Sequence, residues 1–364
     1  MKEIYRTVLS VVLTAIIVGT AVWFLKPTPP EVAEVPALQA RIAELENLVS
    51  QLNATLAAIP RPFKDIKIVF FCGGDPGDVF ASIVYQGAKL AEAILGCKVE
   101  YVFSGWLAEK MVEQFRDAVA REPDAICMMG HPGEAALKDL IDEARRKGIV
   151  VTLINVDLPR IRAKYAAEGM GYVGQDLNAS GRLLATAALK KFNLKPGDHA
   201  LVICPLGSPG RMWREYSVGL TFQEAGLKVG WIDSTGKGWA ADPARAIPEI
   251  TGYLAANPDV KIIVYPGGQM LAAAPMYMEA AGKKAGEIIN IGFDLNPGVL
   301  EAFKKGYVQL TLDQQPLLQG FLPILQACLT VKYKIAGLYI DTGGALIDET
   351  NYFYLEELVK AGYR

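Results

Sequence analysis

Polar and aromatic side chains follow short apolar runs at several places in the chain, where they could bind a small ligand. These segments lie at residues 73–78, 130–133 and 155–157 in the first half, and at residues 205–211, 266–269 and 294–297 in the second. Their carboxylates and amides can hydrogen-bond hydroxyl groups, and their glycines let a ligand approach the backbone. Trp106 and Trp213 lie in or near such loops and could stack on the apolar face of a ring. The pattern predicts a pocket for a small polar molecule.

Some of these residues also have an ordinary structural interpretation. Asp78 and Asp176 precede helical segments, and either one could cap a helix N-terminus as readily as it could bind a ligand. His131 opens a loop before a proline, which is typical of a structural residue rather than of a direct ligand contact. Asn155 and Asp294 directly end apolar strands, and for these two we favour a place in the pocket.

Composition argues against several other kinds of site. A net charge of −2 gives no basic field that would attract nucleic acid. Two histidines are too few for common metal or triad chemistry, and the five cysteines form no C-x-x-C pair. Neither a nucleophile-elbow nor a phosphate-loop motif occurs. We expect no catalytic residue, metal, cofactor or nucleic-acid partner, although carboxylates alone could still serve an enzyme.

From residue 64 onward, short β-branched runs alternate with amphipathic segments, which is typical of an α/β fold. Strands are expected at 66–71, 99–103, 125–129, 149–154, 172–173, 200–204, 228–232, 261–265 and 288–293. Helices are expected at 78–95, 108–121, 134–147, 177–191 and 212–225. Two consecutive sets of parallel units predict two doubly wound parallel-sheet lobes, with ligand bound outside the carboxyl ends of the strands.

The N-terminal region has a different character. Residues 8–25 carry no charge, are preceded by Lys2 and Arg6, and are followed by Lys26, which predicts one transmembrane helix with its N-terminus in the cytoplasm. A cleaved signal peptide, cut near residues 19–21, is the alternative for this segment of residues 1–30. We favour retention as a membrane anchor.

A heptad pattern occupies the next segment, residues 31–62. Its apolar positions alternate spacings of four and three, at Leu38, Ile42, Leu45, Val49, Leu52, Leu56 and Ile59. This seam predicts a short coiled-coil stalk through which copies of the chain self-associate. An amphipathic helix packed on its own domain is the commoner use of such a stripe and is the alternative.

Two motifs in the second half resemble a known family. Residues 291–297 followed by residues 312–316 resemble a strand, a ligand-contacting aspartate, and a crossing strand that ends in a ligand-contacting glutamine. Residues 172–176 resemble the first hinge crossing of the same family. With these motifs, residues 64–364 resemble the sugar-type solute-binding components of ABC transporters, the ribose- and galactose-binding-like proteins of type I periplasmic-binding-protein fold.

The resemblance implies a set of ligand contacts, which are Asp78, Phe80, Asn155, Gln175, Phe293, Asp294 and Gln314. The loop positions add Trp106, His131, Asp157, Trp213, Arg214 and Gln269. The sequence departs from the family where its loop asparagines are replaced by Gly130 and Gly267, and where Ala81 follows the first-loop aromatic residue. These departures leave the ligand unassigned among sugars, nucleosides, polyols and signalling furanoses.

The resemblance also implies a function and a division into lobes. Lobe 1 would comprise residues 63–175 and 315–342, and lobe 2 residues 176–314 and 343–364. A non-enzymatic protein on the outer side of the cytoplasmic membrane would trap a sugar-like ligand between the lobes and deliver it to ABC transporter permease subunits. A component of a sensing system is the alternative. A transcription regulator of similar core would need an N-terminal helix-turn-helix where the apolar segment stands.

Overall fold

The computed structural model describes residues 35–58 and 61–364, and the chain divides into two units between Pro62 and Phe63. The expected transmembrane segment, residues 8–25, lies outside the described residues. In the first unit, residues Val35–Ala58 form one helix, α2. Among the described helices of the chain, none is both long and apolar enough to cross a membrane.

Helix α2 carries part of the expected heptad seam. Between residues 39 and 51, the side chains of Ile42, Leu45 and Val49 are half-buried and the remaining residues are exposed. These three positions share one face of a helix because they are spaced by three and four residues. The three side chains thus share one face of α2, and the assembly of this helix into a coiled coil stays a prediction.

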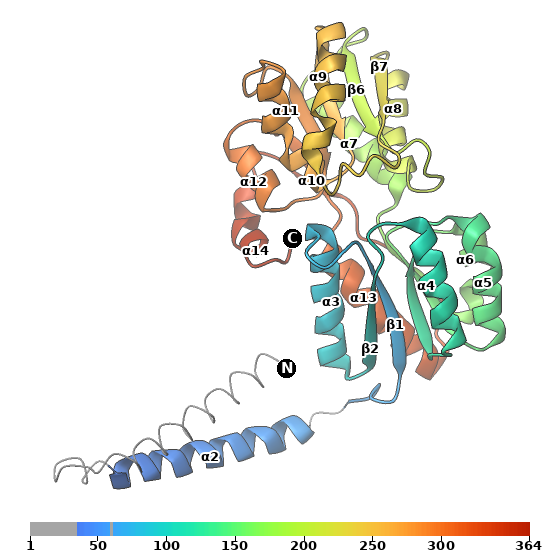
Figure 1. Cartoon of the computed structure of the whole chain (residues 1–364), viewed down its shortest axis with the longest axis vertical. Coiled ribbons are helices and arrows are strands. Elements are labelled where there is room, and N and C mark those ends of the chain that lie inside the picture. Colours follow the sequence, from blue (N-terminus) through green and yellow to red (C-terminus); the bar gives the residue numbers. More distant parts are fainter. Residues whose placement is uncertain (1–34, 59–60) are drawn as a thin grey trace. The chain divides into compact units, whose positions relative to one another are not determined.

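The second unit contains two sheets, and the first forms the centre of lobe 1 (Figure 1). Its strand order is β11-β5-β4-β3-β1-β2, with every pair parallel. The strands are β1 (Lys67–Gly73), β2 (Lys98–Phe103), β3 (Ala125–Met129), β4 (Val150–Ile154), β5 (Tyr172–Gly174) and β11 (Tyr339–Asp341). The helices are α3 (Val79–Leu95), α4 (Ala108–Ala120), α5 (Glu134–Arg146), α6 (Pro159–Tyr165) and α13 (Pro316–Tyr333).

The second sheet forms the centre of lobe 2, in the order β12-β10-β9-β8-β6-β7. Its strands are β6 (His199–Cys204), β7 (Lys228–Asp233), β8 (Val260–Tyr265), β9 (Ile289–Phe293), β10 (Leu310–Asp313) and β12 (Ala345–Ile347). Around it lie α7 (Leu177–Lys191), α8 (Trp213–Glu224), α9 (Ile247–Ala256), α10 (Gly268–Ala272), α11 (Ala274–Ala280), α12 (Pro297–Lys304) and α14 (Glu356–Lys360).

The expected two-lobed α/β fold is confirmed, with one correction to the expectation of parallel sheets. Strand β12 pairs antiparallel to β10 at the edge of the second sheet. The chain leaves β10 at its carboxyl end for lobe 1 and returns through residues 342–344 to the same edge of the second sheet, so β12 runs in the opposite direction to β10. Three short segments, at residues 175–176, 314–315 and 342–344, carry the chain from one sheet to the other.

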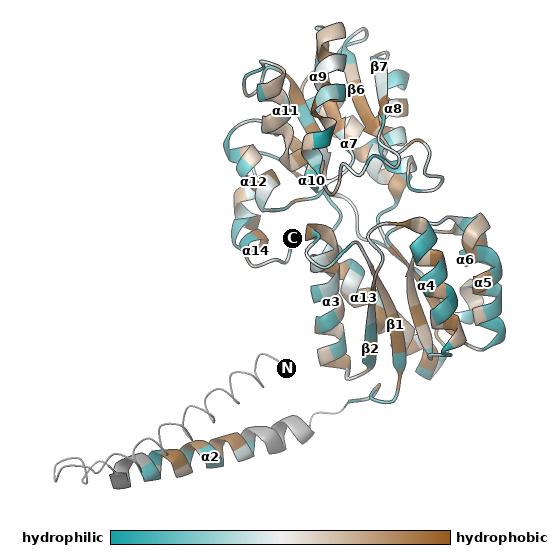
Figure 2. Cartoon of the chain, in the orientation of Figure 1, coloured by the Kyte–Doolittle hydropathy of each residue, from teal (hydrophilic) through white to brown (hydrophobic). Residues whose placement is uncertain are grey.

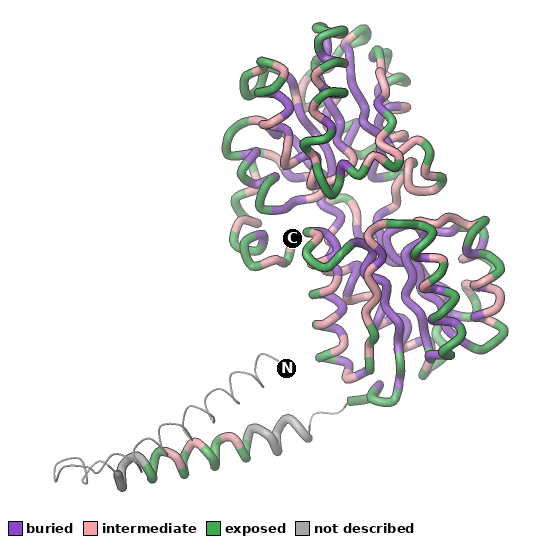
Figure 3. Tube along the Cα trace, viewed as in Figure 1, coloured by how far each residue is buried: buried purple, intermediate pink, exposed green. Residues whose placement is uncertain are grey.

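Each core lies between its sheet and the covering helices. Strands β3, β4 and β6 are buried along their whole length, as expected for parallel strands covered on both faces. Figure 2 shows apolar residues concentrated in the strands, and Figure 3 shows the same strands buried between helices whose outer faces are exposed. All five cysteines are buried free thiols. The strand ends are thereby held at the edges of separately packed cores.

Helices α3 and α13 approach each other unusually closely in lobe 1. A Cβ atom added at Gly87 would lie 2.0 Å from the carbonyl oxygen of Leu317, and one at Gly320 would lie 1.9 Å from that of Val84. Only glycine fits such backbone contact, because any other residue would place a Cβ inside van der Waals distance. This contact fixes the first turns of α13 beside the segment that joins the two sheets.

Candidate functional site

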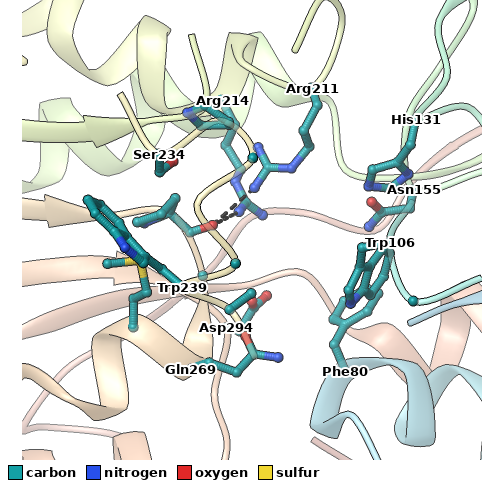
Figure 4. A pocket seen from close by; sticks show the side chains of 18 of the residues that line it. Phe80, Trp106, His131, Asn155, Arg211, Arg214, Ser234, Trp239, Gln269 and Asp294 are labelled. Atoms are coloured by element: carbon teal, nitrogen blue, oxygen red, sulfur yellow. Dashed lines mark hydrogen bonds between the residues drawn. The ribbon is translucent and has the colours of Figure 1, made fainter. Parts of the chain in front are cut away.

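A cavity of about 370 Å³ lies between the carboxyl ends of the two sheets and is lined by residues of both lobes. Its volume is within the range of small-molecule sites. Eight of the residues expected from the sequence line it, namely Phe80, Trp106, His131, Asn155, Arg214, Gln269, Asp294 and Gln314. Figure 4 shows Phe80, Trp106, His131 and Asn155 on one side of the open space, with Trp239, Asp294 and Gln269 on the other.

Several residues at the cavity have left-handed backbone conformations. The φ angles are +60° at Trp106, +61° at Asn155 and +74° at Asp294, and +54° at Gln315, which follows the lining residue Gln314. Asn and Asp tolerate this region better than other non-glycine residues, but each such position still costs of order 1 kcal/mol. Backbone strain of this kind concentrates at functional sites, where it aims a side chain that a relaxed strand end would turn away.

Hydrogen bonds join the two lobes at the floor of the cavity. Gln314 Nε2 donates to Asp294 Oδ1 at 2.6 Å, and Asn155 Nδ2 donates to Gln314 Oε1 at 3.0 Å. Asp294 Oδ2 accepts from the backbone N–H of Gly268 at 3.1 Å. Asn155 from lobe 1 and Asp294 from lobe 2 therefore share one crevice, with Gln314 of the second crossing segment between them.

Asp78 acts beside the cavity. Its Oδ1 accepts from Ala81 N at 2.8 Å and caps α3, as one of the two sequence interpretations requires. Its Oδ2 accepts from Trp106 Nε1 and from Gln269 Nε2, each at 3.2 Å. One carboxylate thus caps a helix, holds the indole of Trp106 against the cavity, and bonds to a residue of the opposite lobe.

Two arginines lie at the start of α8, Arg211 in the turn before the helix and Arg214 in its first turn. Arg211 and Arg214 pair with the fully buried Glu215 at 2.7 and 2.8 Å, and both donate to the carbonyl oxygen of Pro266 (Figure 4). The Arg214 guanidinium also lies 4.1 Å from the ring centre of Phe293. Burial opposes ionisation of Glu215, but the two guanidinium charges outweigh it and hold the pKa of that carboxyl below its usual value. The cluster presents fixed N–H donors.

His131 lies against Trp106, with ring centres 5.2 Å apart. Its Nδ1 atom is buried and makes no hydrogen bond within the described residues. Burial, reinforced by the positive charges of Arg211 and Arg214, lowers the pKa of His131 to about 3. The imidazole is therefore neutral near pH 7 and retains hydrogen-bonding capacity at the cavity wall.

Besides Asp78, four residues expected from the sequence do not line this cavity. Phe293 is fully buried beneath Arg214, and Gln175 Oε1 is engaged by Arg214 Nη1 at 3.1 Å. Asp157 pairs with Arg162 at 2.9 Å. Together with the exposed Trp213, Asp157 and Gln175 border a separate cavity of about 620 Å³ beside the first crossing segment.

Two cavity residues, Ser234 and Trp239, did not follow from the sequence, and Arg211 was the alternative to Arg214 for the arginine of its loop. Arg211, Ser234 and Trp239 all line the cavity, and Trp239 is 4% exposed. Trp239 belongs to the loop after β7, and its position after the carboxyl end of a strand is the signal that could have found it. Arg211 lies three residues before Arg214, a spacing from which sequence alone does not choose between the two.

Comparison with known proteins identifies the class to which this fold and cavity belong. A family model described as the periplasmic binding protein domain matches residues 68–334. This match covers well over half of the chain, so the chain belongs to that family, whose members bind solutes and are not enzymes. The resemblance drawn from the sequence motifs is confirmed.

Particular relatives agree with this assignment. The xylose/arabinose-binding protein XylF of Sulfolobus acidocaldarius is 28% identical over 300 residues, covering 78% of this chain and 71% of that protein. An ABC transporter solute-binding protein from Burkholderia graminis, in complex with D-arabinose, has a TM-score of 0.69 at 22% identity, covering 80% of this chain and 98% of that one. A carbohydrate transporter protein from Acidothermus cellulolyticus, in complex with myo-inositol, has a TM-score of 0.69 at 22% identity, covering 82% and 100%. The solved structures share the fold.

Proposed function

We propose that this protein is an extracytoplasmic solute-binding protein that captures one sugar or cyclic polyol in the interlobe cavity and delivers it to an ABC transporter permease. The observation that carries the proposal is the hydrogen-bonded set of Asn155, Gln314 and Asp294, which draws on both lobes and faces a cavity flanked by aromatic rings. Sugars combine hydroxyl groups around a ring edge with an apolar ring face, and this cavity offers partners for both.

The mechanism requires no covalent chemistry. In the open form a sugar binds to one lobe, and rotation about residues 175–176, 314–315 and 342–344 brings the other lobe over it. Each hydroxyl buried by closure needs a partner, because an unpaired one costs about 1–3 kcal/mol. Asp294, Asn155, Gln269 and the N–H donors of Arg214 would meet those hydroxyls, while Trp106 and Trp239 would contact the ring. A correctly shaped sugar thereby stabilises the closed form, which the permease recognises.

The relatives narrow the chemistry of the ligand. One relative carries xylose and arabinose in its name, and the two solved structures hold D-arabinose and myo-inositol. These compounds are small, neutral and rich in hydroxyl groups. We propose the same class for this protein, with lobe 1 comprising residues 63–175 and 315–342, and lobe 2 comprising residues 176–314 and 343–364.

We propose further that residues 8–25 anchor the protein to the membrane and that residues 31–62 form a stalk that self-associates. The half-buried positions Ile42, Leu45 and Val49 of α2 support the stalk. Sedimentation of a fragment that begins at residue 31 tests it against a fragment that begins at residue 61. The longer fragment should self-associate and the shorter one should remain monomeric. If both fragments were monomeric, the proposed stalk would be contradicted. If the full-length protein were found in the soluble fraction of cells, the proposed membrane anchor would be contradicted.

Thermal unfolding with a panel of ligands tests the binding function. D-Xylose, L-arabinose, D-arabinose, D-fucose and myo-inositol form the panel, with an amino acid and a nucleoside as comparison compounds. A ligand that binds only the native state at about 100 times its Kd adds about 2.7 kcal/mol of stability. At least one sugar or polyol should therefore raise the Tm clearly. A rise with the comparison compounds alone would overturn the proposal.

A further inference from the structure

A fourth amide, Gln319, lies behind the cavity residues in the first turns of α13 and is fully buried. Its Oε1 accepts from Asn155 Nδ2 at 2.9 Å. Its Nε2 donates to the backbone oxygen of Gln314 at 3.0 Å, to Gln314 Oε1 at 3.1 Å and to Thr342 Oγ1 at 3.1 Å. Gln319 therefore contacts one cavity residue of lobe 1 and two of the three segments that join the lobes.

The polarity of this network is fixed by two groups that only accept hydrogen bonds. The carboxylate of Asp294 requires that Gln314 turn its Nε2 toward it, which leaves Gln314 Oε1 facing Asn155 and Gln319. The carbonyl oxygen of Gln314 independently requires that Gln319 present its Nε2 there. The nitrogen and oxygen ends of an amide have nearly the same shape, so only such partners decide its orientation. Here the Asp294 carboxylate and the Gln314 carbonyl oxygen are consistent with one arrangement, in which Gln314 Oε1 accepts from Gln319 Nε2.

The orientation of Asn155 follows from these partners. Both N–H groups of its Nδ2 are used, one by Gln314 Oε1 and one by Gln319 Oε1. Its Oδ1 accepts no hydrogen bond from residues 61–364, and Asn155 lines the cavity. The oxygen is thus the end of this amide that remains for a ligand.

We infer that Gln319 is a positioning residue that makes Asn155 an obligate hydrogen-bond acceptor, so that the ligand must present a donating hydroxyl group at that point. The inference rests on the proposed function, because it concerns which sugar the same cavity selects. A hydroxyl replaced by fluorine at that carbon keeps nearly the same size but cannot donate. The protein should reject that analogue because Asn155 offers only its oxygen. It should separately reject the analogue fluorinated at the hydroxyl that meets Asp294, since a carboxylate also only accepts, and that second rejection does not depend on Gln319.

The rigidity of α13 supports this role. The glycine contacts of α3 and α13 leave the backbone around Gln319 no room to shift. Gln319 Nε2 also donates to Oγ1 of Thr342, which belongs to the third crossing segment. A buried amide with hydrogen-bond partners at both ends keeps its orientation when the ligand enters or leaves. A solvent-exposed amide could turn over at that point.

Binding measurements on two glutamine variants of the same helix test the inference. Gln319→Met removes the amide at similar length, and Gln326→Met is the matched control, because Gln326 is also buried on α13 but neither end of its amide has a hydrogen-bond partner in the described residues. The probes are D-xylose, L-arabinose and myo-inositol, each with its monofluoro analogues, titrated by calorimetry. The native protein should bind the analogue fluorinated at the hydroxyl that meets Asn155 at least about tenfold more weakly than the parent sugar.

Gln319→Met should weaken binding of the parent sugar about tenfold and should reduce discrimination against that one analogue, whereas Gln326→Met should change neither. Gln319→Glu gives a second readout. At pH 8 the second carboxylate oxygen of the introduced glutamate faces the oxygens of Gln314, which should weaken sugar binding. Protonation of that carboxylate toward pH 5 restores a hydrogen-bond donor and should recover the sugar affinity. The native protein should show no such recovery.

The outcomes separate the two proposals. The positioning role would be overturned if Gln319→Met bound sugar with native affinity and native discrimination against the fluoro-sugar. It would also be overturned if Gln319→Glu did not recover its affinity at low pH. Either result would leave the proposed function intact. Absence of binding by every sugar and polyol to the native protein would overturn both.

Discussion

At the scale of single residues, Asp294 has a left-handed backbone conformation, bonds to a segment that joins the lobes, and lines the cavity. Its φ of +74° aims a carboxylate that accepts from Gly268 N and from Gln314 Nε2. Asp294→Asn keeps the size of the side chain and tolerates the left-handed backbone, but its amide nitrogen must face one of two donors. We expect sugar affinity to fall by about 10–100-fold, since one buried hydrogen bond is replaced by an unsatisfied donor.

Calorimetric titration measures this loss. Asp139→Asn provides the control, because the Asp139 side chain is 96% exposed on α5 and should leave binding unchanged. Native affinity in Asp294→Asn would place the ligand away from this carboxylate.

His131 makes stability depend on pH. Its pKa is lowered to about 3 by burial and by Arg211 and Arg214, whereas an unfolded chain has a histidine pKa near 6.5. Between these values the unfolded chain binds more protons than the folded protein, so the free energy of unfolding falls as the pH drops from 6.5 toward 3. His131→Asn lacks this titration. The stability of the native protein relative to the variant should therefore decrease over that window, as measured by denaturant unfolding, and a constant difference would show that His131 is not buried as a neutral ring.

The candidate site was predictable from the sequence where a polar residue directly ends a buried strand. Asn155 and Asp294 follow β4 and β9 without an intervening residue, so the strand alone sets their position at the sheet edge. Trp239 stands six residues beyond β7, and no periodic pattern fixes the path of a loop of that length. The direction of Phe293, which points into the core, depends on the alternation of side chains at the end of β9.

At the scale of elements, the strands were predictable because buried parallel strands are continuous β-branched runs bounded by glycine and polar residues. The pairing of β12 was not predictable, because three residues of strand carry too little pattern and its direction depends on the chain's return from the other lobe. Helices α10 and α11 are each shorter than two turns. So few residues show no clear hydrophobic periodicity, and the sequence alone does not distinguish them from a loop.

The contact of α3 with α13 gives a prediction at this scale. Gly87→Ala would place a Cβ 2.0 Å from the Leu317 carbonyl oxygen and must separate the helices, which should cost about 1–3 kcal/mol of unfolding free energy. Gly252→Ala on α9 is the control, because a Cβ there meets nothing within 4 Å and should stabilise the protein by about 0.5–1 kcal/mol. Chemical denaturation measures both. Equal effects of the two substitutions would contradict the close packing of α3 on α13.

At the scale of the whole 63–364 unit, three connecting segments and one cavity make lobe closure the expected response to ligand. The lobes have separate cores, and a ligand bonded to Asn155 and to Asp294 would tie them together. Small-angle scattering of residues 63–364 should show a smaller radius of gyration when saturating sugar is added. A sugar that binds tightly without changing that radius would argue for binding to one lobe alone.

A crystal structure of the protein with a bound sugar tests the central claim most directly. We expect one sugar molecule in the interlobe cavity, with hydroxyl groups bonded to Asp294 and to Asn155 Oδ1 and with the ring next to Trp106 or Trp239. A sugar bound outside this cavity, or an empty cavity at a sugar concentration that saturates binding in solution, would contradict it.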